Sequence, residues 1–326
     1  PGGSADETSC TIPQSQIFQG AAGRDAIPAI TDPIFVRPGQ SGSEYLRDQD
    51  RVIGLLFGDE VLAIPLNIMW WHEIVNFEAG GIPVAITHCP LTGSSLGFDR
   101  GAADGAEFGV SGLLYQNNLI MYDRTGAESL WPQMTRSARC GERTGTPLAM
   151  VPLLEMSWEG WRRLHPETRV LSSFTGHSRD YQDYPYGNYA EPDNPLVLFP
   201  QEVDTRFPPK ERALGIPDGI GGMVFPFSLL DERGPVTVAH VGLRDGSAVV
   251  FWDRSAQGAM AYRPSLGAQA LSFRVSDGGI FDDQTGTRWR LDGTAAEGPL
   301  DGERLHPVPE AYVAFWFAWP AFHPLM

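Results

Sequence analysis

Short segments in which hydrophobic and polar residues alternate run along most of the chain. Three of them are "VAITHC" from Val84, "NLIMYDR" from Asn118 and "AVVFWDR" from Ala248. Alternation with a period of two is typical of strands that bury one face, and these segments end at Gly, Asp or Pro, as turns do. The pattern predicts a mainly β protein, a β-rich α+β fold. Short helices are expected over residues 68–77 and 157–164 and at the end of the chain.

One series of sequence features occurs twice in the same order. The segment "PVAITH" in the first half parallels "PVTVAH" in the second, and each is followed by a Thr-Gly turn. Two tryptophans, a histidine and a proline then recur with identical spacing, at 158, 161, 165 and 166 and at 316, 319, 323 and 324. Self-similarity over this length indicates an internal duplication into two pseudo-symmetric tandem β modules. Asp123 and Asp283, before the two Thr-Gly pairs, are interpreted as equivalent turn residues.

The repeat divides the chain into four segments. We expect an irregular N-terminal arm over residues 1–50, a first β module over 51–166, a connecting insert rich in Pro and Tyr over 167–211, and a second, degenerate β module over 212–326. The insert contains "YQDYPYGNY" and is too long for an ordinary structureless loop. It is expected to be a strap packed between the modules or, alternatively, a lid over a site.

The candidate chemistry lies where the two copies differ. Only the first module has the segment "WWHEIVN", and only the first has Cys89, where the second has Val241. The segment lacks the second histidine of a HExxH zinc helix, because Asn76 stands at that position. The candidate site therefore consists of four residues, which are His72, Glu73, His88 and Cys89.

Cys89 is central to two alternative kinds of site. A thiolate with imidazoles suits copper or zinc, and His72, Cys89 and His88 are the expected metal ligands. Because neighbours in a strand point to opposite faces, His72 is an easier partner for Cys89 than His88 is. Alternatively, His72 lowers the pKa of Cys89 and makes it a nucleophile. The expected catalytic residues are Cys89 and Glu73, and in the metal site Glu73 orients a ligand or accepts a proton.

A structural role is the alternative for each of these residues. Free cysteine is among the most buried residue types, so Cys89 is also compatible with an inert core thiol, and His72 and Glu73 with a structural pair. A second polar group is formed by Ser111, Tyr115, Asn117 and Asn118, just before a strand. It is expected either to bind a small polar ligand or to close a turn network.

Charge and composition exclude several classes of partner. The formal net charge of -16 disfavours nucleic acids and anionic membrane surfaces. No apolar run reaches the roughly 20 residues of a membrane-spanning helix. Three cysteines leave one unpaired; we expect a disulfide between Cys10 and Cys140 with Cys89 free, or else three free thiols in a reducing compartment. The chain begins at Pro1 with a Gly/Ser/Asp/Glu-rich lead, as a mature exported protein does, which favours a periplasmic or extracellular location.

At these residues the chain resembles a largely bacterial family, domain-of-unknown-function family 3179. The resemblance is carried by "WHEIVN", "PVAITHCPLTGSSLGFDR", "FGVSGLLYQNNLIMYDRTG" and "PYGNY", and it extends over nearly the whole chain. The usual family motif resembles "YCPLCGSA", whereas this chain has His88 for the tyrosine and Thr92 for the second cysteine. A dithiol redox site is therefore not expected to carry over, because one thiol cannot close a disulfide, whereas a mixed His/Cys metal site is compatible with the chain because His88 supplies a replacement donor.

The resemblance implies no defined activity, so two functions are expected from the residues. The first is an exported protein with a metal or small-ligand site in the first module, a candidate metal-dependent oxidoreductase using copper or zinc. The alternative is a non-catalytic binding or assembly protein whose paired modules present an interaction surface.

Overall fold

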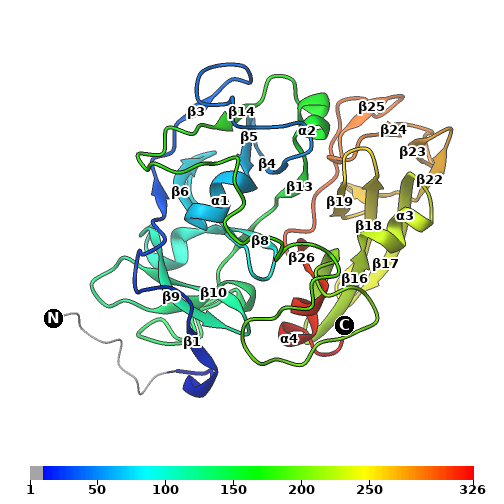
Figure 1. The fold of residues 1–326 in the computed structure, drawn as a ribbon. Coiled ribbons are helices and arrows are strands. Elements are labelled where there is room, and N and C mark those ends of the chain that lie inside the picture. The colour runs from blue at the N-terminus through cyan, green and yellow to red at the C-terminus, as the bar shows by residue number, and fades with distance from the viewer. Residues whose placement is uncertain (1–9) are drawn as a thin grey trace.

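The computed structural model of the chain describes residues 10–326, and Figure 1 shows that strands dominate them. Three sheets combine the strands of the first module with short strands from the N-terminal arm and one from the connecting insert. Their strand orders are β13-β4-β5-β14-β3, β12-β8-β7-β6-β2 and β1-β9-β10-β11. The strands are β1 (Ile17–Gln19), β2 (Ile30–Thr31), β3 (Phe35–Val36), β4 (Arg51–Phe57), β5 (Glu60–Pro65), β6 (Ile74–Ala79), β7 (Ile82–Cys89), β8 (Ser94–Asp99), β9 (Phe108–Tyr115), β10 (Asn118–Asp123), β11 (Leu130–Pro132), β12 (Met150–Val151), β13 (Leu154–Ser157) and β14 (Arg169–Leu171).

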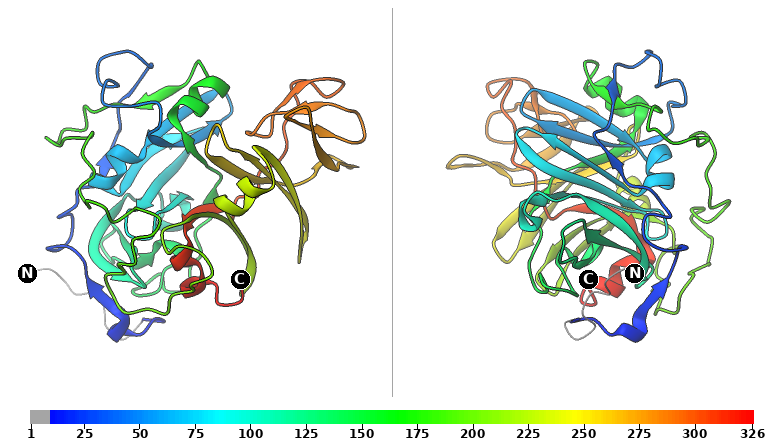
Figure 2. Two further views of the ribbon diagram at one scale, coloured as in Figure 1. Left: turned by 45° about the vertical axis from the view of Figure 1, so that its right-hand side comes forward. Right: turned by 90° about the vertical axis from the view of Figure 1, so that its left-hand side faces the viewer.

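The second module has smaller sheets, which project to one side of the first module in Figure 2. Their orders are β16-β15-β26, β17-β18-β19, β20-β21 and β22-β23-β24-β25. The strands are β15 (Arg212–Asp218), β16 (Gly221–Pro226), β17 (Val236–Leu243), β18 (Gly246–Asp253), β19 (Gly258–Tyr262), β20 (Ser265–Leu266), β21 (Gln269–Ala270), β22 (Phe273–Ser276), β23 (Gly279–Asp282), β24 (Arg288–Trp289), β25 (Ala295–Glu297) and β26 (Tyr312–Phe315). The predicted β-rich class is confirmed.

The helices are few and short, as the alternating pattern predicted. They are α1 (Leu66–His72), α2 (Trp158–Leu164), α3 (Phe227–Glu232) and α4 (Trp319–Phe322), with 3-10 turns η2 (Gln14–Gln16), η3 (Arg100–Ala103), η4 (Gln133–Thr135) and η5 (Trp316–Ala318). Helix α2 agrees with its predicted bounds within one residue, and the side chain of Ser157 caps it by accepting from Gly160 N.

The second half of the predicted helix 68–77 is wrong. Helix α1 ends at His72, Glu73 turns the chain with φ 59°, and β6 begins at Ile74. The β-branched residues Ile74 and Val75 pair with β7 and are both fully buried. Strand pairing that buries both faces of β6 outweighs the helical spacing of the preceding aromatic residues.

The two modules use the same packing devices at matching positions. A Cβ at Gly54 would lie 2.1 Å from the ring of Trp161, and one at Gly215 would lie 2.2 Å from Trp319, so both glycines admit a tryptophan against the sheet. Each glycine lies in the strand that pairs with β13 or β26, respectively. The common origin of the modules stays a hypothesis that these matches support.

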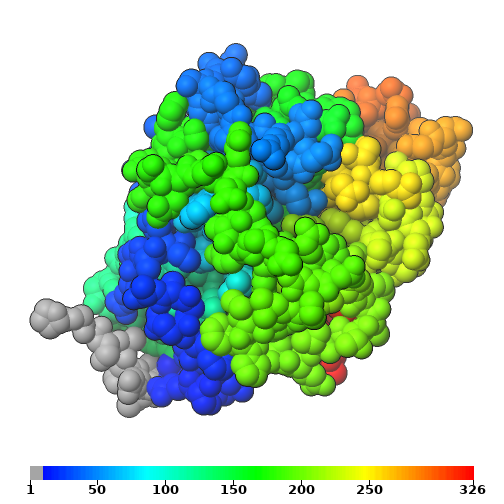
Figure 3. Space-filling view, viewed as in Figure 1, coloured from blue at the N-terminus to red at the C-terminus, as the bar shows by residue number. Residues whose placement is uncertain are grey.

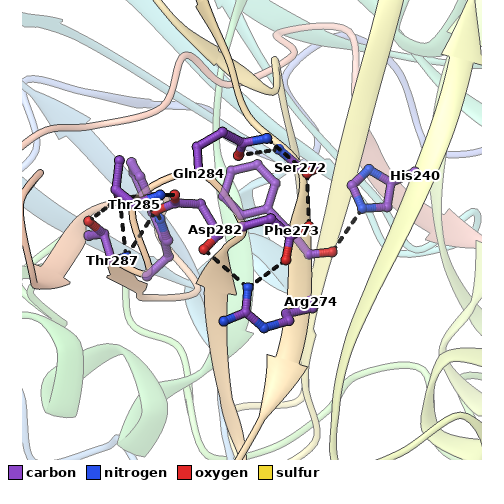
Figure 4. Close-up of polar contacts among 10 residues, drawn as sticks. His240, Ser272, Phe273, Arg274, Asp282, Gln284, Thr285 and Thr287 are labelled. Carbon is purple, nitrogen blue, oxygen red and sulfur yellow. Dashed lines mark hydrogen bonds and ion pairs between the residues drawn. The ribbon is translucent and has the colours of Figure 1, made fainter.

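A buried aspartate anchors a tryptophan in each module. Asp123 accepts a hydrogen bond from Trp131 Nε1 at 2.7 Å, and Asp282 accepts one from Trp289 Nε1 at 3.0 Å. Figure 4 shows Asp282 with Thr285 and Thr287, whose backbone N–H groups also donate to its carboxylate. The residue that matches Asp123 is therefore Asp282, and the expected equivalence with Asp283 is wrong by one position. Asp283 instead faces outward and pairs with Arg274.

The connecting insert, residues 167–211, contacts both modules and is called the strap below. Figure 3 shows it in green across the face of the molecule. Lys210 is the single lysine of the chain. Its ammonium group donates to Leu196 O at 2.6 Å and lies 4.3 Å from the ring centroids of both Tyr189 and Phe317. This contact attaches the strap to the second module. Among residues 10–326, no helix is long and apolar enough to cross a membrane.

Candidate functional site

Buried polar side chains gather around the end of β7 and the start of β8 in the first module. Eight of them are at most 2% exposed: Thr87, His88, Thr92, Ser94, Ser95, Asn118, Gln133 and Glu155. Because burying a polar group costs free energy unless it is hydrogen-bonded, their partners decide what the cluster can do.

One face of β7 carries a fully bonded amide and hydroxyl network. Asn118 Nδ2 donates to Thr92 Oγ1 at 2.9 Å and to Gln133 Oε1 at 2.8 Å, and Gln133 Nε2 donates to Thr87 Oγ1 at 2.8 Å. Asn118 Oδ1 accepts from the backbone N–H of Met134 at 2.9 Å. Thr92 is therefore part of a rigid polar wall.

On the opposite face of β7, a series of hydrogen bonds, called the charged chain below, runs from His88 through Ser95 to Glu155. Ser95 Oγ donates to Glu155 Oε2 at 2.7 Å, and His88 Nδ1 lies 3.0 Å from the same hydroxyl. Since the hydroxyl has one hydrogen, His88 Nδ1 is the donor to Ser95, and Nε2 keeps its lone pair. Glu155 also accepts from Arg51 Nε at 2.7 Å and Arg212 Nη1 at 3.1 Å.

Burial and neighbouring charges set the protonation states of His88 and Glu155. Burial lowers the pKa of His88 to about 4, against the smaller opposing effect of Glu155, so the imidazole is neutral. For Glu155, burial acts to raise the pKa, but Arg51, Arg212 and His88 together outweigh it and lower the pKa. The buried charge of Glu155 is thus balanced by the two arginines, and His88 Nε2 is a neutral acceptor with no hydrogen bond to any residue from 10 to 326.

Cys89 lies on the amide side of β7, away from the His88 chain. It is 1% exposed and unpaired. Its sulfur accepts from Leu119 N at 3.3 Å and lies 3.7 Å from Asn117 O, to which the S–H donates. Burial raises the pKa of Cys89 to about 11, and the negative charge of Glu73 adds to this effect. Cys89 is therefore a thiol at neutral pH and is not activated by His72.

Glu73 is the most unusual residue of the cluster. It is 6% exposed, it ends α1 with a positive φ, and its carboxyl group has no hydrogen bond or ion pair with the described residues. Burial raises the pKa of Glu73 to about 8. Its charge raises the pKa of both Cys89 and Tyr186, and its backbone carbonyl accepts from the N–H of His88, the neighbour of Cys89, at 2.8 Å. A strained backbone and a buried acid without partners are features of functional sites.

His72 is fully engaged elsewhere. Its Nδ1 lies 2.7 Å from Pro28 O and its Nε2 lies 2.8 Å from Tyr181 Oη. Because a carbonyl only accepts, Nδ1 carries the hydrogen and Nε2 accepts from Tyr181, whose hydroxyl in turn contacts Thr175 Oγ1 at 2.5 Å. His72 thus joins the arm and the strap to α1, and neither nitrogen is free for a metal.

The four expected metal-site and catalytic residues are therefore only partly brought together. The backbone of Glu73 bonds to that of His88, the neighbour of Cys89, whereas the side chains of His72 and His88 belong to separate hydrogen-bond groups. Residues 10–326 contain no group of three or more His, Cys, Asp or Glu side chains placed to hold a metal ion. The copper or zinc site stays a prediction of the sequence.

The four residues of the expected ligand patch have separate internal contacts. Ser111 Oγ donates to Ile120 O at 2.5 Å, and the ring of Tyr115 packs against Phe322. Asn117 occupies a hairpin turn with φ 61° and bonds to Phe199 of the strap, while Asn118 belongs to the amide network. These contacts agree with the turn-network alternative and do not form one ligand pocket.

Cys10 and Cys140 form a disulfide with an S–S distance of 2.09 Å. It attaches the N-terminal arm to the first module across 130 residues of sequence. Cys89 is the free cysteine. This is the pairing that the cysteine count favoured.

Sequence reasoning missed the charged chain and most of the amide network, yet a signal for both was present. In matching strand ladders, His88 pairs with Ser95 whereas His240 pairs with Val249. Glu155 and Val313 occupy matching positions in β13 and β26. Each lies two residues before the residue that pairs with an arginine, Ser157 with Arg51 and Phe315 with Arg212. Comparison of the copies at every strand position gives further polar-to-apolar pairs: Thr87 with Ala239, Cys89 with Val241, and Ser94 with Ala248.

Comparison with known proteins gives a family and no activity. The family model described as "Protein of unknown function (DUF3179)" matches residues 24–326. No curated protein and no solved structure matches the chain.

Proposed function

Because the chain belongs to the DUF3179 family, whose description assigns no activity, we propose its function from the site alone. The first module binds a small polar molecule at Glu73 and Cys89, beneath the tyrosines of the strap, and exchanges a proton with it through Glu73. The second module is a scaffold without this chemistry.

One observation carries the proposal. Five positions that are polar or carry a thiol in the first module are apolar at the matching strand positions of the second, namely those of Thr87, Cys89, Ser94, Ser95 and Glu155. The second module keeps the same ladders without them, so the fold does not require them. Buried polar residues that a fold can omit are best explained by a function.

The protonation states of Glu73 and Cys89 define the chemistry that the site can perform. Burial keeps Glu73 protonated near neutral pH, so its carboxyl group donates a hydrogen bond or a proton, as a general acid does. Cys89 is a neutral thiol beside it. A ligand that accepts a hydrogen bond suits this site, because the protonated carboxyl group of Glu73 is a donor.

The strap supplies the cover of this site. Tyr189 Oη donates to Leu91 O at 2.9 Å, two residues after Cys89, and Tyr184 packs edge-on against Trp70. Their rings exclude water, which strengthens a hydrogen bond from Glu73 to a ligand. We propose export as well: a disulfide such as Cys10–Cys140 persists in oxidising compartments, which supports a periplasmic or extracellular location.

The metal-dependent oxidoreductase expected from the sequence requires more rearrangement. His72 would have to release Pro28 or Tyr181, and Cys89 would have to lose its proton. Metal analysis of protein purified without chelator separates the two functions. Copper or zinc bound in equal amount to the chain, and lost in Cys89→Ala, would favour the oxidoreductase and contradict the site proposed here.

Ligand-dependent thermal stabilisation tests the proposed function. A panel of small polar molecules is screened against the native chain, Glu73→Gln, Cys89→Ser and Glu78→Gln, an exposed glutamate of the same strand region that serves as the matched control. We expect ligands that raise the melting temperature of the native chain and of Glu78→Gln but not of Glu73→Gln. Ligands that stabilise Glu73→Gln and the native chain equally would overturn the proposal.

A further inference from the structure

The strap brings two aromatic rings to the end of α1. Tyr184 of the strap contacts Trp70 of α1 edge-on, with ring centroids 4.8 Å apart, and the ring of Tyr186 lies 5.5 Å from that of Tyr184. All three side chains are half-buried, so each keeps some accessible surface. These three rings are called the aromatic group below.

Glu73 adds an acid to this aromatic group. It lies three residues after Trp70, at the end of the same helix, and residues three apart lie on the same side of a helix. Its carboxyl group is buried and has no hydrogen bond or ion pair with the described residues. Burial raises the pKa of Tyr186, and the negative charge of Glu73 raises it further. An ionised Glu73 therefore calls for a positive charge that the protein does not supply.

The arginines of this region are engaged elsewhere. Arg212 donates to Glu155 at 3.1 Å and lies 5.3 Å from the ring centroid of Phe315. Arg179 lies over the ring of Trp71, 5.5 Å from its centroid. Among residues 10–326, no lysine or arginine lies over the rings of the aromatic group, and none pairs with its acid.

The strap already holds one ammonium group between aromatic rings. The Nζ atom of Lys210 lies 4.3 Å from the ring centroids of both Tyr189 and Phe317, without a carboxylate partner. Aromatic faces attract cations through the ring quadrupole, and the attraction grows when water is excluded. The aromatic group at α1 offers the same kind of surface, with an acid in addition.

We propose that the ligand of the Glu73 and Cys89 site is a small organic amine, whose nitrogen pairs with Glu73 and whose positive charge faces the aromatic group. This inference rests on the proposed function and names its ligand class. The nitrogen lone pair of a neutral amine accepts the proton of the carboxyl group, which leaves an ammonium–carboxylate pair. An amine that is already protonated in solution forms the same pair, and the proton of Glu73 then leaves to the solvent.

Calorimetric titration with benzylamine tests this ligand class. Measurements in two buffers of different ionisation enthalpy count the protons released on binding, and benzyl alcohol is the neutral comparison ligand of similar shape. Glu73→Gln removes the acid, and Glu78→Gln is its matched control. Tyr186→Leu removes a ring and Tyr186→Phe keeps it, while Phe322→Leu changes a half-buried ring of α4 and is the second control. Thermal unfolding verifies that each variant is folded.

We expect one benzylamine per chain and the release of close to one proton at pH 7, because Glu73 holds its proton in the free site. Binding should be at least tenfold weaker in Glu73→Gln, without proton release, and about fivefold weaker in Tyr186→Leu. Tyr186→Phe and both controls should bind as the native chain does.

Three results would overturn the amine assignment: no binding of benzylamine to the native chain, equal binding of benzyl alcohol and benzylamine, or equal binding of benzylamine by Glu73→Gln and Glu78→Gln. The proposed function is judged separately by the ligand screen described above. Neutral molecules that stabilise the native chain but not Glu73→Gln, together with no binding of benzylamine, would uphold the site and reject only the amine.

Discussion

Gly54 and Gly215 each make room for a tryptophan, and Asp123 and Asp282 each anchor one, so the two modules share their frame. They differ in the buried side chains at matching strand positions. Glu155 of the first module accepts hydrogen bonds from two arginines and a serine, whereas Val313 at the matching position of β26 has an apolar side chain. The difference separates residues that build the fold from residues that the fold only tolerates.

Buried polar and charged residues that the fold does not require lower the stability of the folded state. A buried ion pair is weak evidence for stability, because the desolvation of its charges offsets their attraction. A buried acid without partners, such as Glu73, is destabilising outright once it ionises. The second module shows that apolar residues serve at these positions, so the polar set in the first module calls for a functional explanation.

The largest expected effect comes from giving the first module the residue of the second. Glu155→Val leaves the partly buried Arg51 and Arg212 without their carboxylate, and we expect a loss of about 3 kcal/mol in the free energy of unfolding. The counterpart, Val313→Ala, removes only two methyl groups and should cost roughly 2 kcal/mol. Urea denaturation of both variants measures the difference. A Glu155→Val variant as stable as the native chain would mean that the charged chain contributes nothing.

Glu73→Gln is expected to stabilise the protein by an amount that increases with pH. The folded pKa of Glu73, about 8, lies above its ordinary value of 4.5, so the folded state holds a proton that the unfolded state has released between these pH values. Native stability therefore falls, relative to the variant, as pH rises from 4.5 to 8. The gain from the substitution should be roughly 3 kcal/mol at pH 7. Denaturation at pH 4.5 and 7 measures it, and an equal effect at both pH values would contradict the assignment.

The shared frame should respond equally in both modules. Gly54→Ala and Gly215→Ala each bring a Cβ into a tryptophan ring, and we expect each to cost about 2 kcal/mol, as overpacking does. Thermal unfolding of the two variants compares them. If one glycine tolerated alanine and the other did not, the modules would not share this packing device.

The smallest expected effect concerns the reactivity of Cys89. Because its pKa is raised to about 11, Cys89 is a thiol at neutral pH, and iodoacetamide, which reacts with the thiolate, should label the native protein far more slowly than the unfolded chain. Mass spectrometry should find less than about a tenth of native chains labelled under conditions that label an unfolded chain fully. Rapid labelling of the native protein at pH 7 would instead indicate an accessible thiolate at the site.

Local sequence patterns predicted the strands well because alternation records the burial of one face. They failed at residues 74–77, where β-branched residues buried on both sides have no alternation to read. The functional set was found only in part. Glu73 and Cys89 stood out because the second copy lacks them, whereas Ser95 and Glu155 are single polar residues inside strands. The role of Glu155 depends on Arg51 and Arg212, which donate hydrogen bonds to it. These arginines lie far apart in the sequence and come together only through the contact between the modules.

The engagement of His72 was equally inaccessible to sequence reasoning. Its two partners come from residue 28 of the arm and residue 181 of the strap. Neither segment has a regular pattern that predicts where it packs. The spacing of His72 from Cys89 allowed a shared site, and only the folded positions of Pro28 and Tyr181 exclude His72 from it.

Infrared spectroscopy of the carboxyl groups tests the central claim most directly. The account predicts that the native protein at pH 6.5 shows the carbonyl band of a protonated carboxylic acid in the difference spectrum against Glu73→Gln, and that the band disappears as pH rises past about 8. The control, Glu78→Gln, should retain the band. A native spectrum identical to that of Glu73→Gln in this region at pH 6.5 would show that Glu73 is ionised and would contradict the proposed site.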